Sequence, residues 1–292
     1  MSFGNRFYSG RLCLIGSGLI GGSLALALKR AGAVGEVVGC GRNLATLQRA
    51  QALGIVDRIA ADLPEAVLGA DMVVLAVPML AMREVLEQIQ PVLQPGTLLT
   101  DVGSVKQSVI DDARAALGEK LAQFIPGHPI AGTEKSGPDA AFAELFEQRR
   151  VIVTPLAENI EADIARVVAM WQCAGAQVER MSAAHHDQVL AATSHLPHLL
   201  AFTLVDSLAR MEDSQEVFRY AAGGFRDFTR IAASDPTMWR DIALANSNEI
   251  KQMLHRYQQE LEVLQRDLDA QDGQALFERF QRAQAAREGL KF

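Results

Sequence analysis

A glycine-rich segment near the amino terminus limits the fold more than any other feature. Residues 11–15 (RLCLI) form a short apolar run, and residues 16–21 (GSGLIG) follow it directly. Residues 19–31 then carry Leu and Ala at helical spacing. This order predicts a strand, a tight turn and a helix, which is the context in which a GxGxxG segment indicates a dinucleotide site.

Each glycine of this segment has an expected physical role. Gly16 permits the tight turn, Gly18 lets the backbone approach a pyrophosphate, and Gly21 lets the helix pack closely on the strand. The first N–H groups of the helix would face the phosphates. The other interpretation is a glycine-rich turn with no ligand. The candidate cofactor-binding residues of this segment are Gly16, Ser17, Gly18, Leu19, Ile20 and Gly21.

Short apolar runs alternate with helical stretches over the first part of the chain. This pattern favours a buried, mainly parallel sheet in a doubly wound α/β fold. After residue 182 long stretches rich in Ala, Leu, Gln, Glu and Arg predict helices, at 184–211 and 236–269. We therefore expect a Rossmann domain over 1–181 and an all-α domain over 182–292. The other expected strands are 36–40, 71–77, 98–102, 151–154 and 176–181, with helices at 43–53 and 159–173.

Composition excludes several classes of protein. The net charge of -7 argues against a general nucleic-acid binder, which needs a basic face. The three cysteines lie in no CxxC pair, which favours reduced thiols and a cytoplasmic protein. The first residues lack the apolar core of a secretory signal, and no unbroken apolar run is long enough to predict a membrane span.

The residues after the second expected strand bear on cofactor choice. An NAD site usually has an acidic residue here for the ribose 2′-hydroxyl. The sequence instead reads Cys40, Gly41, Arg42 and Asn43, and Arg42 is placed to meet a 2′-phosphate. The sequence therefore favours NADP over NAD, the alternative being a solvated Arg42 in an NAD enzyme. The other residues expected in the cofactor crevice are Val77 and Pro78.

Four later clusters carry candidate chemistry. Ser104 follows the fourth strand and either faces the crevice or caps a helix beginning near Val105. His128 lies in a glycine-rich segment, 127–137, where no regular element is expected. His195 and His198 are three residues apart on one helical face, and the proline between them should bend or restart the helix. The fourth cluster, 223–241, begins with glycines and continues with paired Arg and Asp, which indicate either a cationic site or surface ion pairs.

In these motifs the sequence resembles the prephenate/arogenate (cyclohexadienyl) dehydrogenase family of tyrosine biosynthesis. The motifs GSGLIGGS, DVGSVK, GHPIAGTEKSG, SHLPH and GFRDFTRIAASDPTMWRD occur in the family's order, and the resemblance extends from about residue 11 to 260. It implies a nucleotide-binding domain, a helical dimerisation domain and an active site between them. The implied reaction oxidises and decarboxylates prephenate or arogenate with NAD or NADP.

The resemblance also implies residue roles. His128 would accept the proton of the ring hydroxyl, and Ser104 would hydrogen-bond that hydroxyl or position the nicotinamide. Arg230 would bind a substrate carboxylate, which a planar guanidinium does well. Trp239 would approach the site of the neighbouring subunit. Gly41 departs from the pattern, because relatives that use NAD tend to have aspartate there. The remaining implied substrate-binding residues are His195, His198, Asp227, Glu134, Thr133 and Gly223.

Three alternatives remain from the residues alone. A β-hydroxyacid-type dehydrogenase would need a lysine early in the helical domain, and no lysine occurs between Lys135 and Lys251. A metal enzyme would need more ligands than the histidines at 185, 186, 195 and 198 supply, in the absence of HExxH or paired cysteines. A non-catalytic nucleotide sensor would need the fold but not His128, Ser104 and Arg230.

Assembly and regulation are expected to be simple. The helix predicted over 247–269 has an apolar stripe that favours a homodimer, although packing within one chain explains such a stripe equally. Only about 25 residues follow that helix, so tyrosine is expected to act by competition at the active site. The stripe consists of Ile250, Met253, Leu254, Tyr257, Leu261 and Leu264.

Overall fold

The computed structural model describes residues 7–290. Residues up to Ser247 form one compact unit, and those from Asn248 onward form a second. The last strand ends at Arg180 and the next helix begins at Ala183, so strands give way to helices close to residue 181. The boundary between the two compact units, after Ser247, therefore differs from the point near residue 181 at which strands give way to helices.

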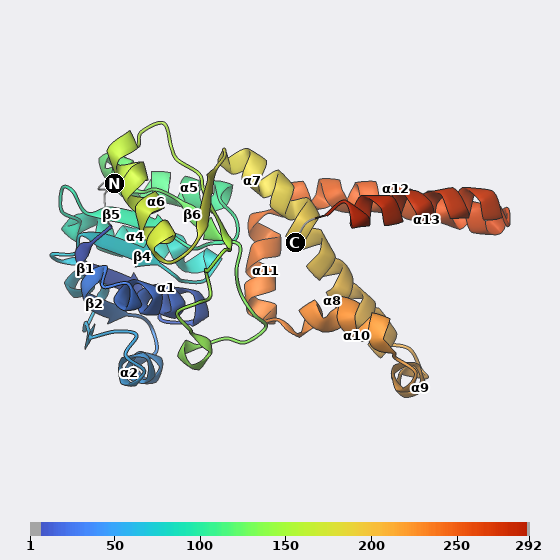
Figure 1. Cartoon of the computed structure of the whole chain (residues 1–292), viewed down its shortest axis with the longest axis horizontal. Helices are drawn as coiled ribbons and strands as arrows, with labels where there is room; N and C mark the ends of the chain where they lie inside the picture. The colour runs from blue at the N-terminus through green and yellow to red at the C-terminus, as the bar shows by residue number, and fades with distance from the viewer. Residues whose placement is uncertain (1–6, 291–292) are drawn as a thin grey trace, which may run out of the picture. The chain divides into compact units, whose positions relative to one another are not determined.

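A five-stranded parallel sheet organises the first unit (Figure 1). Its order is β3-β2-β1-β4-β5, with β1 at the centre and paired with both β2 and β4. The sequence run 36–40 thus lies beside 11–15, as a doubly wound fold requires. The strands are β1 Ser9–Ile15, β2 Val34–Cys40, β3 Arg58–Ile59, β4 Met72–Leu75 and β5 Leu98–Asp101.

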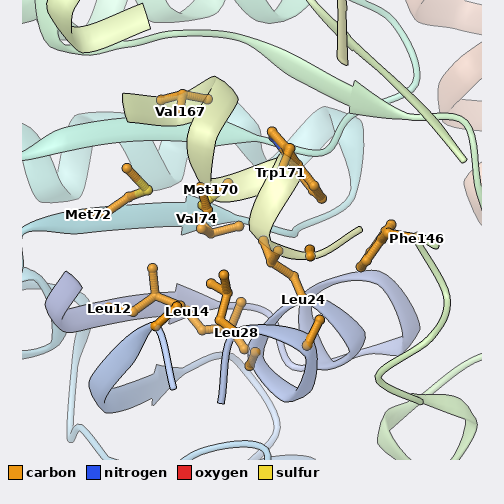
Figure 2. Packing of buried hydrophobic residues seen from close by; sticks show 14 of the residues in the cluster. Leu12, Leu14, Leu24, Leu28, Met72, Val74, Phe146, Val167, Met170 and Trp171 are labelled. Atoms are coloured by element: carbon orange, nitrogen blue, oxygen red, sulfur yellow. The ribbon is translucent and has the colours of Figure 1, made fainter. Parts of the chain in front are cut away.

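Successive side chains of the strands pack alternately into two separate hydrophobic cores, one on each face of the sheet. Leu12 and Leu14 of β1 point to one face of the sheet, where they pack with Leu24 of α1 (Leu19–Arg30) and Trp171 of α6 (Glu161–Cys173) (Figure 2). Cys13 and Ile15 enter the opposite core, with residues of α4 and α5. Both faces are covered, which explains why the strands are continuously apolar. The remaining helices of this part are α2 Leu44–Ala52, α3 Leu63–Val67, α4 Met82–Ile89 and α5 Gln107–Leu117.

The later strands, including those expected at 151–154 and 176–181, form a second, three-stranded sheet. β6 (Gly127–Pro129) runs antiparallel to β7 (Arg150–Val153), which runs parallel to β8 (Gln177–Arg180). The prediction that His128 lies in a loop was wrong, because His128 is the middle residue of β6. A three-residue strand that contains Gly and Pro has no period-2 pattern by which the sequence could indicate it.

Two predicted long helices are interrupted in the structure. α7 (Ala183–Leu190) passes through a π-helical turn, Ala191–His195, into α8 (Leu196–Ala209), so the helix restarts beside Pro197 as expected. The stretch 236–269 was predicted as one helix but divides at Asn246 into two. The intervening and following helices are α9 Ser214–Arg219, α10 Gly223–Thr229, α11 Pro236–Ala245 and α12 Ser247–Asp269.

The second unit is an antiparallel helical hairpin. α12 is joined by a short turn to α13 (Gly273–Glu288), a helix that the sequence did not predict. Arg279 of α13 pairs with Glu260 at 2.9 Å and Asp267 at 3.5 Å, which fixes the pairing of the two helices. Tyr257 and Leu261 of the predicted stripe are exposed in the single chain. The stripe is therefore only partly covered in the single chain, since Ile250 is buried and Met253, Leu254 and Leu264 are half-buried.

One described stretch, Ala183–Ala209, is long and apolar enough to cross a membrane by length and composition alone. The sequence predicted no such stretch because polar residues such as Thr193 and Ser194 interrupt it. Core helices of soluble proteins meet the same criterion, so a single stretch of this kind is weak evidence.

Candidate active site

The glycines of the first turn meet the requirements of a nucleotide site. Gly16 has a φ of +97°, and an added Cβ would lie 2.2 Å from the carbonyl oxygen of Ala76. At Gly21 an added Cβ would lie 2.4 Å from the carbonyl oxygen of Gly16. Gly18 has no atom within 4 Å of that position. Gly16 and Gly21 thus lie against other protein atoms that leave no room for a side chain. The space next to Gly18 is open, and a pyrophosphate would approach there.

Two further features of this turn fit a phosphate group. α1 begins at Leu19 with no side-chain cap, so the first N–H groups of the helix are free for an anion. The hydroxyl of Ser17 is buried and has no hydrogen-bond partner among the described residues. Leu19 is buried and Ile20 half-buried behind the turn, and Val77 and Pro78 follow the adjacent strand β4.

The residues after β2 are open to solvent. Gly41, Arg42 and Asn43 are all exposed, and Arg42 makes no ion pair with any of residues 7–290. The side chain of Asn43 caps α2 by accepting a hydrogen bond from the backbone N–H of Thr46 at 3.1 Å. An added Cβ at Gly41 would meet nothing closer than Leu47, at 3.9 Å. There is therefore room at position 41 for a side chain.

A buried ion pair joins the end of β5 to the start of β6. Lys106 and Asp101 are fully buried and bonded to each other. The Nζ atom of Lys106 also donates to the carbonyl of Gly127 at 2.7 Å, and Asp101 accepts from the N–H of Gly127 at 3.1 Å. Burial lowers the pKa of Lys106, and the negative charge of Asp101 opposes that change. This pair holds the strand residue next to His128.

The helix after this segment is not capped by Ser104, which was one of the two interpretations of that residue. α5 begins at Gln107 with Lys106 at its N-cap position, so Ser104 does not cap it. The cap comes from Asp187 of α7, whose carboxylate accepts from the N–H groups of Lys106 and Gln107, both at 2.8 Å. Ser104 is left half-buried in the segment before the helix. A cap from 80 residues away leaves no local sequence pattern.

His128 is tied to a second buried histidine. Its Nδ1 atom lies 2.8 Å from Nε2 of His186, and Nδ1 of His186 lies 2.7 Å from Oδ1 of Asp187. Burial, assisted by the positive potential of His186, lowers the pKa of His128 well below its ordinary value. Burial also lowers the pKa of His186, against the raising effect of Asp187. Both rings are thus held neutral near pH 7, as a proton acceptor must be.

A third buried imidazole lies close by. Nδ1 of His195 lies 3.0 Å from Nδ2 of Asn246, which also donates to the carbonyl of Asp187 at 3.0 Å. Burial lowers the pKa of His195 to about 4. The ring of His198 stacks on Trp239 with centroids 3.8 Å apart. Trp239 was expected near a neighbouring subunit, whereas here it contacts histidines of its own chain.

The cationic part of the site is exposed. Nη1 of Arg230 lies 3.6 Å from Oε2 of Glu134, which brings these two expected residues together. The positive charge of Arg230 contributes to the lowered pKa of His198, after burial as the main cause, so the arginine lies near that imidazole. Asp227 pairs instead with Arg226 at 3.7 Å. Gly223 begins α10, and the Thr133 hydroxyl accepts the N–H of Lys135 at 3.2 Å.

Sequence reasoning missed the residues that support the histidines. Lys106 and Asp101 were seen only as part of a motif, and His186 was considered only as a metal ligand. Asp187 and Asn246 were not considered at all. The available signal was the pair His186–Asp187, a base directly beside a carboxylate in one short helix. Within residues 7–290, no group of three or more His, Cys, Asp or Glu is placed to hold a metal ion.

The fold and the site together define a class: two-domain proteins in which a dinucleotide-binding α/β domain precedes a helical domain. Residues 24–180 match the family model described as prephenate dehydrogenase, nucleotide-binding domain, and residues 182–282 match prephenate dehydrogenase, dimerization domain. The chain belongs to the prephenate dehydrogenase family.

Individual relatives agree over nearly the whole chain. The cyclohexadienyl dehydrogenase of Zymomonas mobilis is 40% identical over 96% of this chain and 96% of its own. A crystal structure of prephenate dehydrogenase from A. aeolicus, in complex with hydroxyphenyl propionate and NAD+, is similar with a TM-score of 0.90 and 35% identity, covering 97% of this chain and 98% of that one. The Synechocystis arogenate dehydrogenase is similar with a TM-score of 0.80 and 29% identity, covering 95% and 99%.

Proposed function

We propose that this protein oxidises and decarboxylates prephenate to 4-hydroxyphenylpyruvate, or arogenate to tyrosine, with hydride transfer to a nicotinamide cofactor. The observation that carries the proposal is the group of buried imidazoles near Arg230. The lowered pKa of His128 keeps it neutral at physiological pH, and it lies close to His195, while Arg230, which can bind an anion, lies near His198. The named activities of the relatives support the same substrates.

The reaction assigns a task to each group. The ring carbinol loses its hydride to the nicotinamide, which supplies the oxidant when bound. His128 takes or shares the hydroxyl proton as the C–O bond gains double-bond character. The carbon–carbon bond to the ring carboxylate then breaks, its electrons enter the ring, and carbon dioxide leaves as the ring becomes aromatic. Arg230 would hold a substrate carboxylate through two hydrogen bonds, in place of its present pairing with Glu134.

The remaining site residues are proposed in supporting roles. Ser104 would hydrogen-bond the reacting hydroxyl or position the nicotinamide. His195, His198 and Trp239 would line the substrate pocket, with Thr133, Gly223 and Asp227 at its edge. The turn at 16–21 would bind the pyrophosphate, with Val77 and Pro78 beside the nicotinamide half. We propose these roles for a Rossmann domain over 1–181 and a substrate and dimerisation domain over 182–292.

The experiment that tests the activity follows the absorbance of reduced nicotinamide with prephenate and arogenate, each against NAD and NADP. We expect turnover of at least one acid. Binding of cofactor without turnover of either acid would reject the proposal and favour a nucleotide sensor. The same four reactions decide which acid is preferred, and added tyrosine should raise KM without changing kcat if it competes at the active site.

NADP is proposed as the preferred cofactor because an exposed Arg42, with no acidic residue from 40 to 43, suits a 2′-phosphate. The A. aeolicus structure contains NAD+, so the choice needs a direct test. Gly41→Asp has room for its side chain and should raise the ratio of kcat/KM for NAD over NADP. Arg42→Ala should lower kcat/KM for NADP alone. A wild-type kcat/KM that is higher with NAD would reject this part of the proposal.

We also propose a cytoplasmic homodimer formed through the helical region. The match to a dimerization domain supports the assembly, as do the exposed stripe residues Tyr257 and Leu261 of α12. The free thiols of Cys13, Cys40 and Cys173 are compatible with a reducing compartment. Light scattering of the intact protein should give twice the chain mass of 31.6 kDa. A monomeric mass at micromolar concentration would contradict it.

A further inference from the structure

We propose that Asp187 fixes His128 and His195 in opposite neutral tautomers. In this arrangement Nε2 of His128 is a bare proton acceptor, and Nε2 of His195 carries a hydrogen. Asp187 acts on the first ring through its carboxylate and on the second through its backbone carbonyl. It is a positioning residue, as are His186 and Asn246, through which it acts.

The first step follows from the carboxylate of Asp187. It accepts hydrogen bonds from two backbone N–H groups of Lys106 and Gln107, so it is oriented and offers only acceptor atoms. His186 lies 2.7 Å from it through Nδ1. That nitrogen must therefore carry the hydrogen. Because His186 is buried and neutral, its Nε2 is left without one.

The tautomer of His186 in turn determines the tautomer of His128. The Nε2 atom of His186 can only accept, and it lies 2.8 Å from Nδ1 of His128. His128 must then donate from Nδ1, so its Nε2 is bare. A histidine with the hydrogen on the other nitrogen would place two lone pairs against each other at this distance. The charged and titratable groups that face these rings are Lys106, Asp101, Asp187 and His195.

The third step runs from the same residue to His195. An amide NH₂ carries two donor hydrogens, and Nδ2 of Asn246 donates one of them to the carbonyl oxygen of Asp187. The second points to Nδ1 of His195, at 3.0 Å, which must accept. Neutral His195 then carries its hydrogen on Nε2. Asp187 and His186 also face this ring, together with His198.

The tautomers of His128 and His195 are complementary. Among residues 7–290, neither Nε2 atom has a hydrogen-bond partner, so both are available to a ligand. The bare atom can take the hydroxyl proton, and the N–H of His195 can donate to a carboxylate or carbonyl oxygen. A hydroxyl group meets an acceptor and an anionic oxygen meets a donor, which orients the substrate. The use of these tautomers in turnover rests on the proposed function, whereas the tautomers themselves do not.

The tautomers are measured directly, without substrate. Protein labelled with ¹⁵N at its six histidines is examined by two-bond ¹H–¹⁵N correlation at neutral pH, with signals assigned from single-histidine substitutions. We expect the Nδ1–H form for His128 and the Nε2–H form for His195. The same form for both rings, or the reverse pair, would overturn the proposal whether or not the protein turns over any acid.

Two substitutions test separately the path from Asp187 to His128 and the path from Asp187 to His195. Asp187→Ala removes both side-chain acceptor atoms but keeps the backbone carbonyl, so it should change the tautomer of His128 and leave His195 in the Nε2–H form. Asn246→Leu removes the donor to His195 and should change only that ring. If Asp187→Ala alters neither ring, Asp187 does not set the tautomers. If a variant fails to fold, the wild-type spectrum still decides between the expected and the opposite forms.

Kinetics test the positioning role of His186. In His186→Gln an amide oxygen can stand at the Nε2 position and accept from His128, whereas His186→Leu offers no acceptor. The leucine variant should lose at least about 10-fold in kcat, within the roughly 10²- to 10⁴-fold that a positioned base supplies, with KM little changed. The glutamine variant should recover most of that loss.

The adjacent, exposed His185 supplies the matched control, because His185→Gln should leave kcat unchanged. Equal kcat for His186→Leu and wild type would overturn the positioning role. Absence of turnover by the wild type would reject the proposed function instead, and the tautomers would still be decided by the spectra.

Discussion

The two polar groups of the candidate site are built in opposite ways. His128, His186 and Asp187 are buried, and each is held by hydrogen bonds of 2.8 Å or less. Arg230 and Glu134, by contrast, expose 64% and 45% of their side chains and lie 3.6 Å apart. A buried network keeps one geometry because breaking any bond leaves an unpaired polar group. An exposed pair at this distance exchanges partners at little cost.

This difference suggests a division of labour. Proton transfer needs a base at a fixed distance and in a fixed protonation state, which burial supplies. Capture of a charged substrate needs a cation that water and the substrate can reach. The buried group should therefore control kcat, and the exposed group should control binding.

The largest expected effect is that of His128→Ala. Loss of the base should lower kcat by about 10²- to 10⁴-fold, with a smaller change in KM. Steady-state kinetics with the preferred acid and cofactor measures both. A variant that raised KM while keeping kcat would reverse the assignment of the two groups.

The buried ion pair under His128 should matter for folding. Lys106→Met leaves Asp101 charged and buried without its partner, which typically costs about 3–5 kcal/mol. Chemical denaturation measures the change in the free energy of unfolding. The exposed pair Arg83–Glu87 provides the comparison, because Arg83→Ala should cost far less than Lys106→Met. Equal losses would show that burial does not distinguish these two pairs.

The sequence predicted the sheet of the first domain well because its signals are local. The apolar runs ending at Ile15 and Leu75, and the glycines that follow Ile15, each carry a period or a turn that neighbours in sequence determine. The paired positions of His195 and His198 followed from helical spacing. The restart of the helix at Pro197 followed from the missing N–H of proline.

The parts that the sequence did not predict depend on distant partners. Asp187 caps a helix that begins 80 residues earlier, and this excludes the alternative interpretation of Ser104 as the cap of that helix. β6 is a strand only because β7 lies beside it. The break at Asn246 places its amide against Asp187 and His195, although the apolar spacing continues across it. Such contacts follow from tertiary packing, which local patterns do not contain.

Arg230→Ala tests the exposed half of the comparison. Removal of a charge-assisted hydrogen bond costs about 1.5–3 kcal/mol, so KM should rise by roughly 10- to 100-fold while kcat changes less. Arg226→Ala is the control in the preceding helix α10, since Arg226 is an exposed arginine that pairs with Asp227. A larger rise in KM for Arg226→Ala would move the anion site away from Arg230.

The smallest expected effect concerns acid stability, and it separates the buried imidazoles from the exposed charges. The folded-state pKa of His195 is about 4, below the ordinary value near 6.5 that holds in the unfolded chain. Below pH 6.5 the unfolded chain therefore binds more protons, and the free energy of unfolding falls as pH falls. The decline is at most about 1.4 kcal/mol per pH unit for each such histidine.

The exposed carboxylates act in a different window. Interactions lower the pKa of Glu65 and of Asp139, so their contributions are lost only below their ordinary values near 4. Denaturation midpoints between about pH 7 and 5 thus report the histidines. His195→Gln should flatten this part of the curve, whereas substitution of the exposed His255 by Gln should not. The same slope of the curve in both variants would mean that His195 is protonated in the folded protein. The buried site would then be more accessible to water than its hydrogen bonds indicate.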